Sequence, residues 1–108
     1  MKLPEYTPAQ VLKAVSDLTG ISETAIKGTR RLRAEVQARQ MVCVCLRRFT
    51  ALSYPEMRIF LDAKSLNAVY MRCRAVEKQM SHDDQQAMYA TVKKKMGRPS
   101  FKKKVRRP

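Results

Sequence analysis

Residues 53–80 read SYPEMRIFLDAKSLNAVYMRCRAVEKQM. Ser53 and Glu56 have the spacing of a capping box, and Pro55 suits the first turn of a helix. We expect a short helix over 54–61, a break near residue 62, and a longer helix over 66–79. Apolar residues recur in the second helix at spacings of three and four: Leu66, Val69, Tyr70, Cys73, Val76 and Met80. This pattern predicts a helix-turn-helix over about 54–79.

In a DNA-binding helix-turn-helix, the second helix lies in the major groove with its N-terminal residues nearest the bases. The residues placed there are Lys64, Ser65, Asn67, Ala68 and Arg72. An asparagine suits bidentate contact with adenine, and an alanine suits the thymine methyl group. Arg74 and Lys78 are better placed for phosphates. Many helix pairs of this kind bind nothing, so the pattern alone leaves both readings open.

The rest of the chain also predicts helices, and no strand pair is evident. Helices are expected over 8–19, 23–27 and 34–51, and a sixth begins after Ser81 and ends at Gly97. We therefore expect an all-α fold, a compact bundle of about six helices that contains the helix-turn-helix, followed by a basic, disordered C-terminal tail.

Basic charge is concentrated in two places. The 108 residues include 23 Lys and Arg against 9 Asp and Glu, a net charge of +14 that calls for a polyanionic partner. Residues 93–108 hold no acid, so the chain divides into a helical domain, 1–92, and a basic tail. The tail residues expected on DNA are Lys95, Arg98, Lys102, Lys103, Lys104, Arg106 and Arg107. The second cluster, Lys27, Arg30, Arg31 and Arg33, surrounds a predicted loop at Gly28.

Residues 8–80 resemble the C-terminal DNA-binding domain of the bacterial replication initiator DnaA. The order of the elements matches. The family has Arg-Gln-Met where this chain has residues 39–41, and Ser-Leu-Pro-Glu-Ile where it has Ser-Tyr-Pro-Glu-Met at 53–57. The resemblance implies a helix-turn-helix bundle, similar to that of the Trp repressor, that binds double-stranded DNA. It also implies that the basic loop reaches the minor groove. Arg39 is predicted, with Arg74 and Lys78, to contact phosphates.

The resemblance departs at the recognition helix. The family signature Gly-Arg-Asp-His-Thr-Thr-Val falls on residues 63–69, where this chain reads Ala-Lys-Ser-Leu-Asn-Ala-Val. Lys64 keeps the basic charge and Val69 is unchanged, but the four base-reading residues differ. The resemblance therefore carries the fold but not the initiator's usual binding site.

The tail contains a second, shorter resemblance. Gly97-Arg98-Pro99 is similar to the core of an AT-hook, which lies in the narrow minor groove of A·T-rich DNA. Residue 96 is Met where an AT-hook usually has Arg. The alternative is a polybasic tail that binds DNA of any sequence.

No catalytic, metal or cofactor site is predicted. No Gly-x-x-x-x-Gly-Lys-Ser/Thr phosphate loop occurs, so we expect neither a nucleotide cofactor nor the family's ATPase domain. Cys43, Cys45 and Cys73 are expected in the core rather than on a metal. No signal peptide and no apolar run of bilayer length is evident, which favours a cytoplasmic, nucleoid-associated protein with no membrane partner.

The leading hypothesis is a non-enzymatic, sequence-specific regulator that binds double-stranded DNA and controls replication or transcription in a bacterium, phage or plasmid. One alternative is a basic protein associated with RNA or ribosomes, although no sheet with exposed aromatic residues is predicted. Another is an adaptor that binds a protein through one of its helices, with the tail only localising it.

Overall fold

The computed structural model describes residues 6–28 and 30–97. Within these ranges the chain is entirely helical, as the sequence predicts, and contains no strand. The helices are α1 (Pro8–Thr19), α2 (Glu23–Lys27), α3 (Arg33–Phe49), α4 (Tyr54–Leu61), α5 (Leu66–Gln79) and α6 (His82–Met96).

Most helix starts follow the capping residues of the sequence. Capping boxes join Thr7 with Gln10 and Ser53 with Glu56, and serine side chains cap α2, α5 and α6. The end of α3 differs from the prediction by two residues. The Thr50 hydroxyl donates to the carbonyl of Leu46 at 2.6 Å and accepts from the N–H of Leu52 at 3.3 Å, so it takes up groups on both sides of the break.

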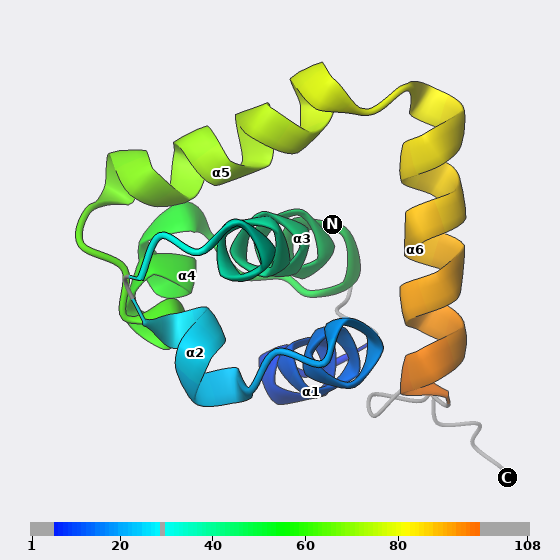
Figure 1. Ribbon diagram of the computed structural model, residues 1–108, viewed down its shortest axis with the longest axis horizontal. Coiled ribbons are helices and arrows are strands. Elements are labelled where there is room, and N and C mark those ends of the chain that lie inside the picture. The colour runs from blue at the N-terminus through cyan, green and yellow to red at the C-terminus, as the bar shows by residue number, and fades with distance from the viewer. Residues whose placement is uncertain (1–5, 29, 98–108) are drawn as a thin grey trace, which may run out of the picture.

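Helix α3 forms the centre of the bundle. Figure 1 views it nearly end-on, with α5 on one side, α1 on the other and α6 standing alongside. Its residues Val42, Cys43, Cys45 and Leu46 are fully buried. Helices α1, α2 and α5 pack directly on α3, whereas α4 packs on α5 and α6 packs mainly on α1. The second helix of the predicted helix-turn-helix, α5, is thus positioned by α3.

Helix α6 closes the bundle against the start of the chain. Tyr6 is 1% exposed, and its hydroxyl donates to the Gly97 carbonyl at 3.0 Å. Val92 is fully buried and Met96 is half-buried, which anchors the last turn. Residues 93–96 belong to α6, which ends at Gly97 as expected, so the basic run that the sequence begins at residue 93 starts inside this helix. The predicted disorder of the tail concerns residues 98–108, which lie outside the described residues.

Two residues of the predicted apolar stripe on α5 are exposed. Leu66 is 46% exposed and Tyr70 is 40% exposed, whereas Val69, Cys73 and Val76 are buried. The apolar stripe that the helical period predicts on α5 is wider than the surface that α3 and α4 cover. The outer edge of the stripe therefore faces solvent. Ile59 of α4 is also an exposed apolar residue, at 74%.

Candidate nucleic-acid interface

A tight turn sets the direction in which α5 leaves α4. Asp62 ends α4 in the left-handed conformation, with φ 55° and ψ 41°. The Ala63 N–H donates to the carbonyl of Arg58 at 3.0 Å, and the Arg58 guanidinium donates back to the carbonyl of Ala63 at 3.3 Å. These bonds satisfy carbonyl groups that the helix end would leave open. The turn that the sequence predicts after residue 61 is therefore held by this backbone hydrogen bond and by the side chain of Arg58.

The first turn of α5 presents a short, nearly uncharged surface. The Ser65 hydroxyl accepts from the Ala68 N–H at 3.1 Å, so Ser65 caps the helix. Asn67 is exposed, and no other described residue holds its amide in a hydrogen bond. Leu66 is exposed beside it, although the helical period assigns Leu66 to the core. Leu66 is the first residue of α5 and precedes the part of the helix that packs on its neighbours. The helical period contains no information on where packing begins, so it assigns Leu66 wrongly.

A hollow of about 320 Å³ joins the basic loop to the start of α5. It is lined by Arg31, Val36, Arg39, Lys64, Ala68 and Arg72. Arg31 comes from the α2–α3 loop, Lys64 from the turn and Arg72 from α5, and no other described residue forms an ion pair with any of the three. The fold thus brings together two segments, 30–33 and 64–72, that the sequence separately suggested for DNA contact.

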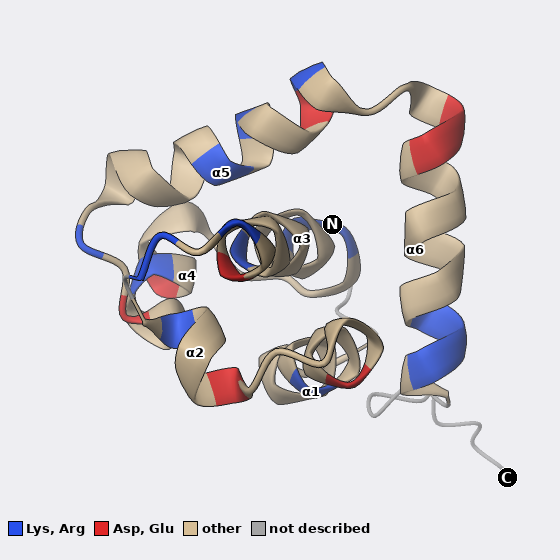
Figure 2. Ribbon diagram, viewed as in Figure 1, with Lys and Arg blue, Asp and Glu red and all other residues tan. Residues whose placement is uncertain are grey.

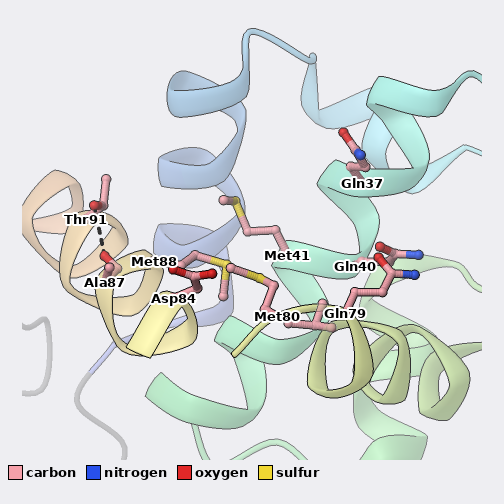
Figure 3. Close-up of a pocket in the computed structure, with 10 residues that line it drawn as sticks. Gln37, Gln40, Met41, Gln79, Met80, Asp84, Ala87, Met88 and Thr91 are labelled. Atoms are coloured by element: carbon pink, nitrogen blue, oxygen red, sulfur yellow. Dashed lines mark hydrogen bonds between the residues drawn. The ribbon is translucent and has the colours of Figure 1, made fainter. Parts of the chain in front are cut away.

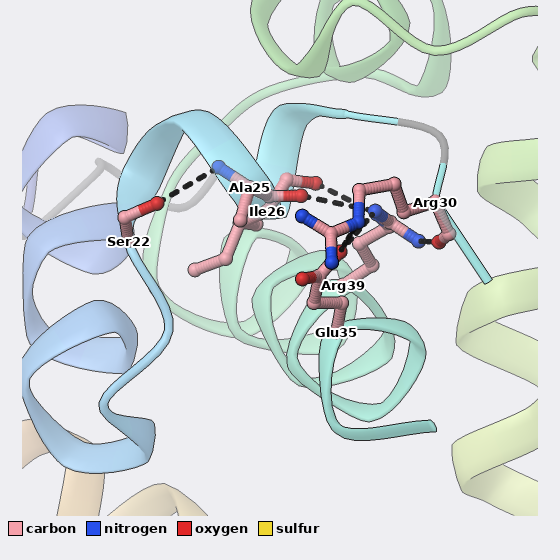
Figure 4. Close-up of polar contacts among 6 residues, drawn as sticks. All are labelled: Ser22, Ala25, Ile26, Arg30, Glu35 and Arg39. Atoms are coloured by element: carbon pink, nitrogen blue, oxygen red, sulfur yellow. Dashed lines mark hydrogen bonds and ion pairs between the residues drawn. The ribbon is translucent and has the colours of Figure 1, made fainter. Parts of the chain in front are cut away.

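Arg39, a predicted phosphate contact, is almost completely buried. It is 5% exposed, and its guanidinium donates to the carbonyl of Ile26 at 3.0 Å, of Ala25 at 3.0 Å and of Arg30. Figure 4 shows the side chain directed at the end of α2 and the loop behind it. These bonds join α3 to the end of α2 and to the basic loop, and Arg39 also lines the hollow.

Glu35 is the counter-ion of this cluster. Its carboxylate lies 3.5 Å from the Arg39 guanidinium and 3.8 Å from Nε of Arg30, and its side chain is 8% exposed. Burial lowers the pKa of Arg39, and the nearby charge of Arg72 lowers it further, while Glu35 opposes both effects. One carboxylate therefore faces several cations, and the surface that remains around the hollow is electropositive.

The other predicted contacts are more scattered. Arg33, Arg74 and Lys78 are exposed. The ammonium of Lys27 lies 4.9 Å from the centre of the Phe60 ring, and the Arg74 guanidinium donates to the Tyr70 hydroxyl at 3.4 Å. Arg74 and Lys78 line a separate hollow of about 450 Å³ along the outer side of α5. The structure therefore does not bring them into the hollow that holds Lys64 and Arg72.

The comparison with protein families agrees with this architecture. Residues 8–76, more than half of the chain, match the family described as the bacterial DnaA protein helix-turn-helix. The chain belongs to this DnaA helix-turn-helix family. Membership implies binding of double-stranded DNA, because that is what the DNA-binding domain of DnaA does.

One curated relative extends the similarity. The chain is 27% identical over 96 residues to the chromosomal replication initiator protein DnaA of Geobacter sp. (strain M21). The match covers 88% of this chain but 21% of the relative, so the chain spans about a fifth of that initiator's length. No solved structure matches the chain.

The predicted tail contacts of this DnaA-like chain lie mostly beyond α6. Lys95 is exposed in the last turn of α6, beside Lys93 and Lys94. Figure 2 shows this basic end well apart from the α2–α3 loop and the start of α5. The remaining tail residues lie outside the described residues: Arg98, Lys102, Lys103, Lys104, Arg106 and Arg107.

The cysteines of the DnaA-like domain lie in its core. Burial raises the pKa of the Cys45 thiol to about 12. A hydrogen bond between Cys43 and Cys73 lowers the pKa of Cys43 and raises that of Cys73. Across residues 6–28 and 30–97, no three His, Cys, Asp or Glu side chains come close enough together to hold a metal ion. Over the same ranges, no helix has the length and apolar character needed to cross a membrane.

Proposed function

We propose that this chain is a sequence-specific reader of duplex DNA. Helix α5 enters the major groove with Lys64, Ser65, Asn67, Ala68 and Arg72 towards the base edges, and Leu66 is exposed among them as a further apolar contact. The basic loop lies against the adjacent minor groove through Arg30, Arg31 and Arg33. Arg74 and Lys78 lie further along α5, where phosphates of the same groove pass.

The observation that carries this proposal is the hollow shared by Arg31, Lys64 and Arg72. Three cations from separate segments lie around it without an ion-pair partner among the described residues. Like charges held this close repel one another, and a phosphate between them removes that cost. A duplex places its phosphates along both grooves, so it meets the loop and α5 together.

The division between affinity and selectivity follows from the residues present. The basic side chains bind phosphates of any sequence, whereas Asn67 and the small neighbours of the first turn distinguish bases. We infer that the chain acts without catalysis, in replication or transcription control in a bacterium, phage or plasmid, and is associated with the nucleoid. Its relative is a chromosomal replication initiator protein and is much longer than this chain.

Selection from random duplexes at near-physiological salt tests the proposal. We expect a defined motif for the natural chain, and a relaxed base preference for Asn67→Ala at a cost of about 1–3 kcal/mol on the preferred site. Gln79→Ala removes an exposed amide at the other end of α5 and is the matched control.

Two outcomes would contradict the proposal, and a third would change the residues assigned to base reading. A selection that returns no motif would remove the claim of sequence specificity. Structured RNA that displaces the selected duplex at equal concentration would favour the RNA-associated alternative. An unchanged motif with Asn67→Ala would remove Asn67 from the base-reading residues and leave the rest of the interface to be mapped.

A further inference from the structure

A second hollow lies between α3, the end of α5 and α6. Its volume is about 520 Å³. Met41, Met80 and Met88 line it, and Figure 3 shows their side chains projecting into the space between α3 and α6. Its polar rim includes Gln37, Gln40 and Gln79, and no basic residue lines it. Flexible, polarisable methionine side chains adapt to apolar groups of several shapes, so the hollow suits one apolar side chain.

Acidic residues gather at the α5–α6 end of this hollow. Asp84 lines it, Asp83 precedes Asp84 in the first turn of α6, and Glu77 is exposed in the last turns of α5. No ion pair joins any of these three to another described residue. The first turn of α6 is therefore acidic in a chain of net charge +14. An occupant that fits both parts carries an apolar group followed by basic residues.

The chain itself contains such a segment. It continues past Gly97 with the eleven residues RPSFKKKVRRP, in which Phe101 precedes Lys102–Lys104. Gly97 lies at the far end of α6 from Asp84. The helix rises ~1.5 Å per residue, so Met88 lies about 14 Å and Asp84 about 20 Å back along α6 from Gly97.

The reach of the segment matches these distances. An extended chain spans about 3.3–3.6 Å per residue, so four residues place Phe101 about 14 Å from Gly97, at the level of Met88. Six residues place Lys103 about 20 Å away, at the level of Asp84. A segment that turns back along α6 therefore brings its aromatic ring to the methionines and its lysines to the acids in the same register.

We propose that residues 98–104 dock along α6, with Phe101 in the methionine-lined hollow and Lys102–Lys104 against Asp83 and Asp84. Tethering favours this occupant over a free peptide of the same chemistry, because a short linker gives an effective concentration in the millimolar range. A duplex competes for the same lysines, so docking withholds the tail from DNA until phosphates displace it. The docking itself does not depend on the proposed function.

A single tryptophan reports on this contact. The chain has no Trp, so Phe101→Trp introduces one fluorophore into the full-length protein. We expect blue-shifted emission and weak quenching by acrylamide in the absence of DNA. Adding Asp83→Asn and Asp84→Asn should move the emission to that of an exposed indole, as should Thr91→Lys, which places a cation in the hollow. Excess duplex should have the same effect in the unaltered background.

A control variant should lose the same charge elsewhere in the chain without affecting the tryptophan. Asp17→Asn with Glu23→Gln removes the same amount of charge from α1 and α2, and should leave the emission unchanged. The proposal would be overturned if the Phe101→Trp protein without further changes showed the emission of an exposed indole. It would also be overturned if neither the Asp83 and Asp84 changes nor Thr91→Lys altered the emission. A blue shift that vanishes on dilution would overturn it as well, because the hollow would then hold the tail of a second copy. Circular dichroism verifies that each variant is folded.

Discussion

At the scale of single residues, Arg39 is a buried charge that joins α3 to the loop of the candidate interface. Its guanidinium joins the last carbonyls of α2, the loop carbonyl of Arg30 and the carboxylate of Glu35. Five donors in a fixed planar fork suit several acceptors at once. The sequence shows only a basic residue near the start of a helix. Nothing in its spacing reveals that the acceptors come from a segment 13 residues earlier.

Replacing Arg39 by Lys should destabilise the fold. One ammonium cannot reach all of these carbonyls, and a buried pair that loses its geometry costs about 3 kcal/mol or more. Urea unfolding followed by circular dichroism measures the loss. Arg33→Lys, at an exposed position in the same region, should change the stability by less than about 0.5 kcal/mol. If Arg39→Lys left stability intact and weakened only DNA binding, Arg39 would return to the phosphate contacts.

The three thiols should be inert in the folded protein. Cys43 and Cys45 are fully buried, Cys73 is 3% exposed, and the pKa of Cys45 is about 12. Burial keeps a disulfide reagent away from all three thiols. The raised pKa values of Cys45 and Cys73 also keep those two protonated, and the thiolate is the reactive form. At pH 8 we expect negligible reaction of the native chain with Ellman's reagent, and rapid reaction of all three thiols in urea. Fast labelling of one native thiol would show that α3 and α5 separate readily.

At the scale of elements, the helix-turn-helix is the part that the sequence predicts best. Capping residues fix both ends of α4 and the start of α5, and these signals are local. What fails is the choice of faces. Leu66 and Tyr70 belong to the helical period, yet exposure depends on where α3 and α4 end beside α5, which no local pattern contains. The meeting of the basic loop with α5 around one hollow is likewise a tertiary fact.

The Ser53–Glu56 capping box should make stability depend on pH on the acid side. The Ser53 N–H donates to the Glu56 carboxylate at 2.8 Å, and this bond lowers the pKa of Glu56 below its usual 4.5. A group whose pKa is lowered by folding stabilises the fold above its unfolded value. That contribution is lost as the pH falls through the folded pKa. Glu56→Gln should therefore flatten the decline in unfolding free energy below about pH 4.5.

Two comparisons sharpen this experiment. Ser53→Ala should cost about 1 kcal/mol at neutral pH, because it removes the acceptor of the Glu56 N–H. The Thr7–Gln10 box has the same geometry but no titrating group, so Gln10→Ala should lower stability without altering the slope with pH. If Glu56→Gln left the decline in unfolding free energy below about pH 4.5 unchanged, the pH dependence would come from other carboxylates.

At the scale of the whole molecule, the charge divides between a folded surface and a segment beyond it. The sequence describes Lys93–Lys95 in two ways, as the start of a basic run and as the end of a helix that stops at Gly97. In the structure they occupy the last turn of α6, where cations interact favourably with the helix dipole. Composition alone cannot distinguish a basic helix end from a basic tail, because both contain the same number of basic residues.

Ending the chain after Gly97 should weaken DNA binding without changing its target. Six basic residues are removed, and each phosphate contact contributes about 0.9 to the dependence of log affinity on log salt. We expect the slope to fall by up to about 5 and the selected motif to stay the same. Binding to several duplexes from 50 to 200 mM salt provides the measurement. Loss of preference for A·T-rich duplexes alone would instead identify Gly97-Arg98-Pro99 as an AT-hook.

The hydrogen bond from Tyr6 to Gly97 has a consequence for how the protein is made. It joins positions 91 residues apart, and α1 rests against α6 as well as α3. During synthesis the N-terminal helix emerges first, but its final partner emerges last. The surface of α1 that α6 covers must therefore remain open until residue 97 has left the ribosome. Assembly of this bundle is completed only after translation of the folded part has ended, however early its first helix forms.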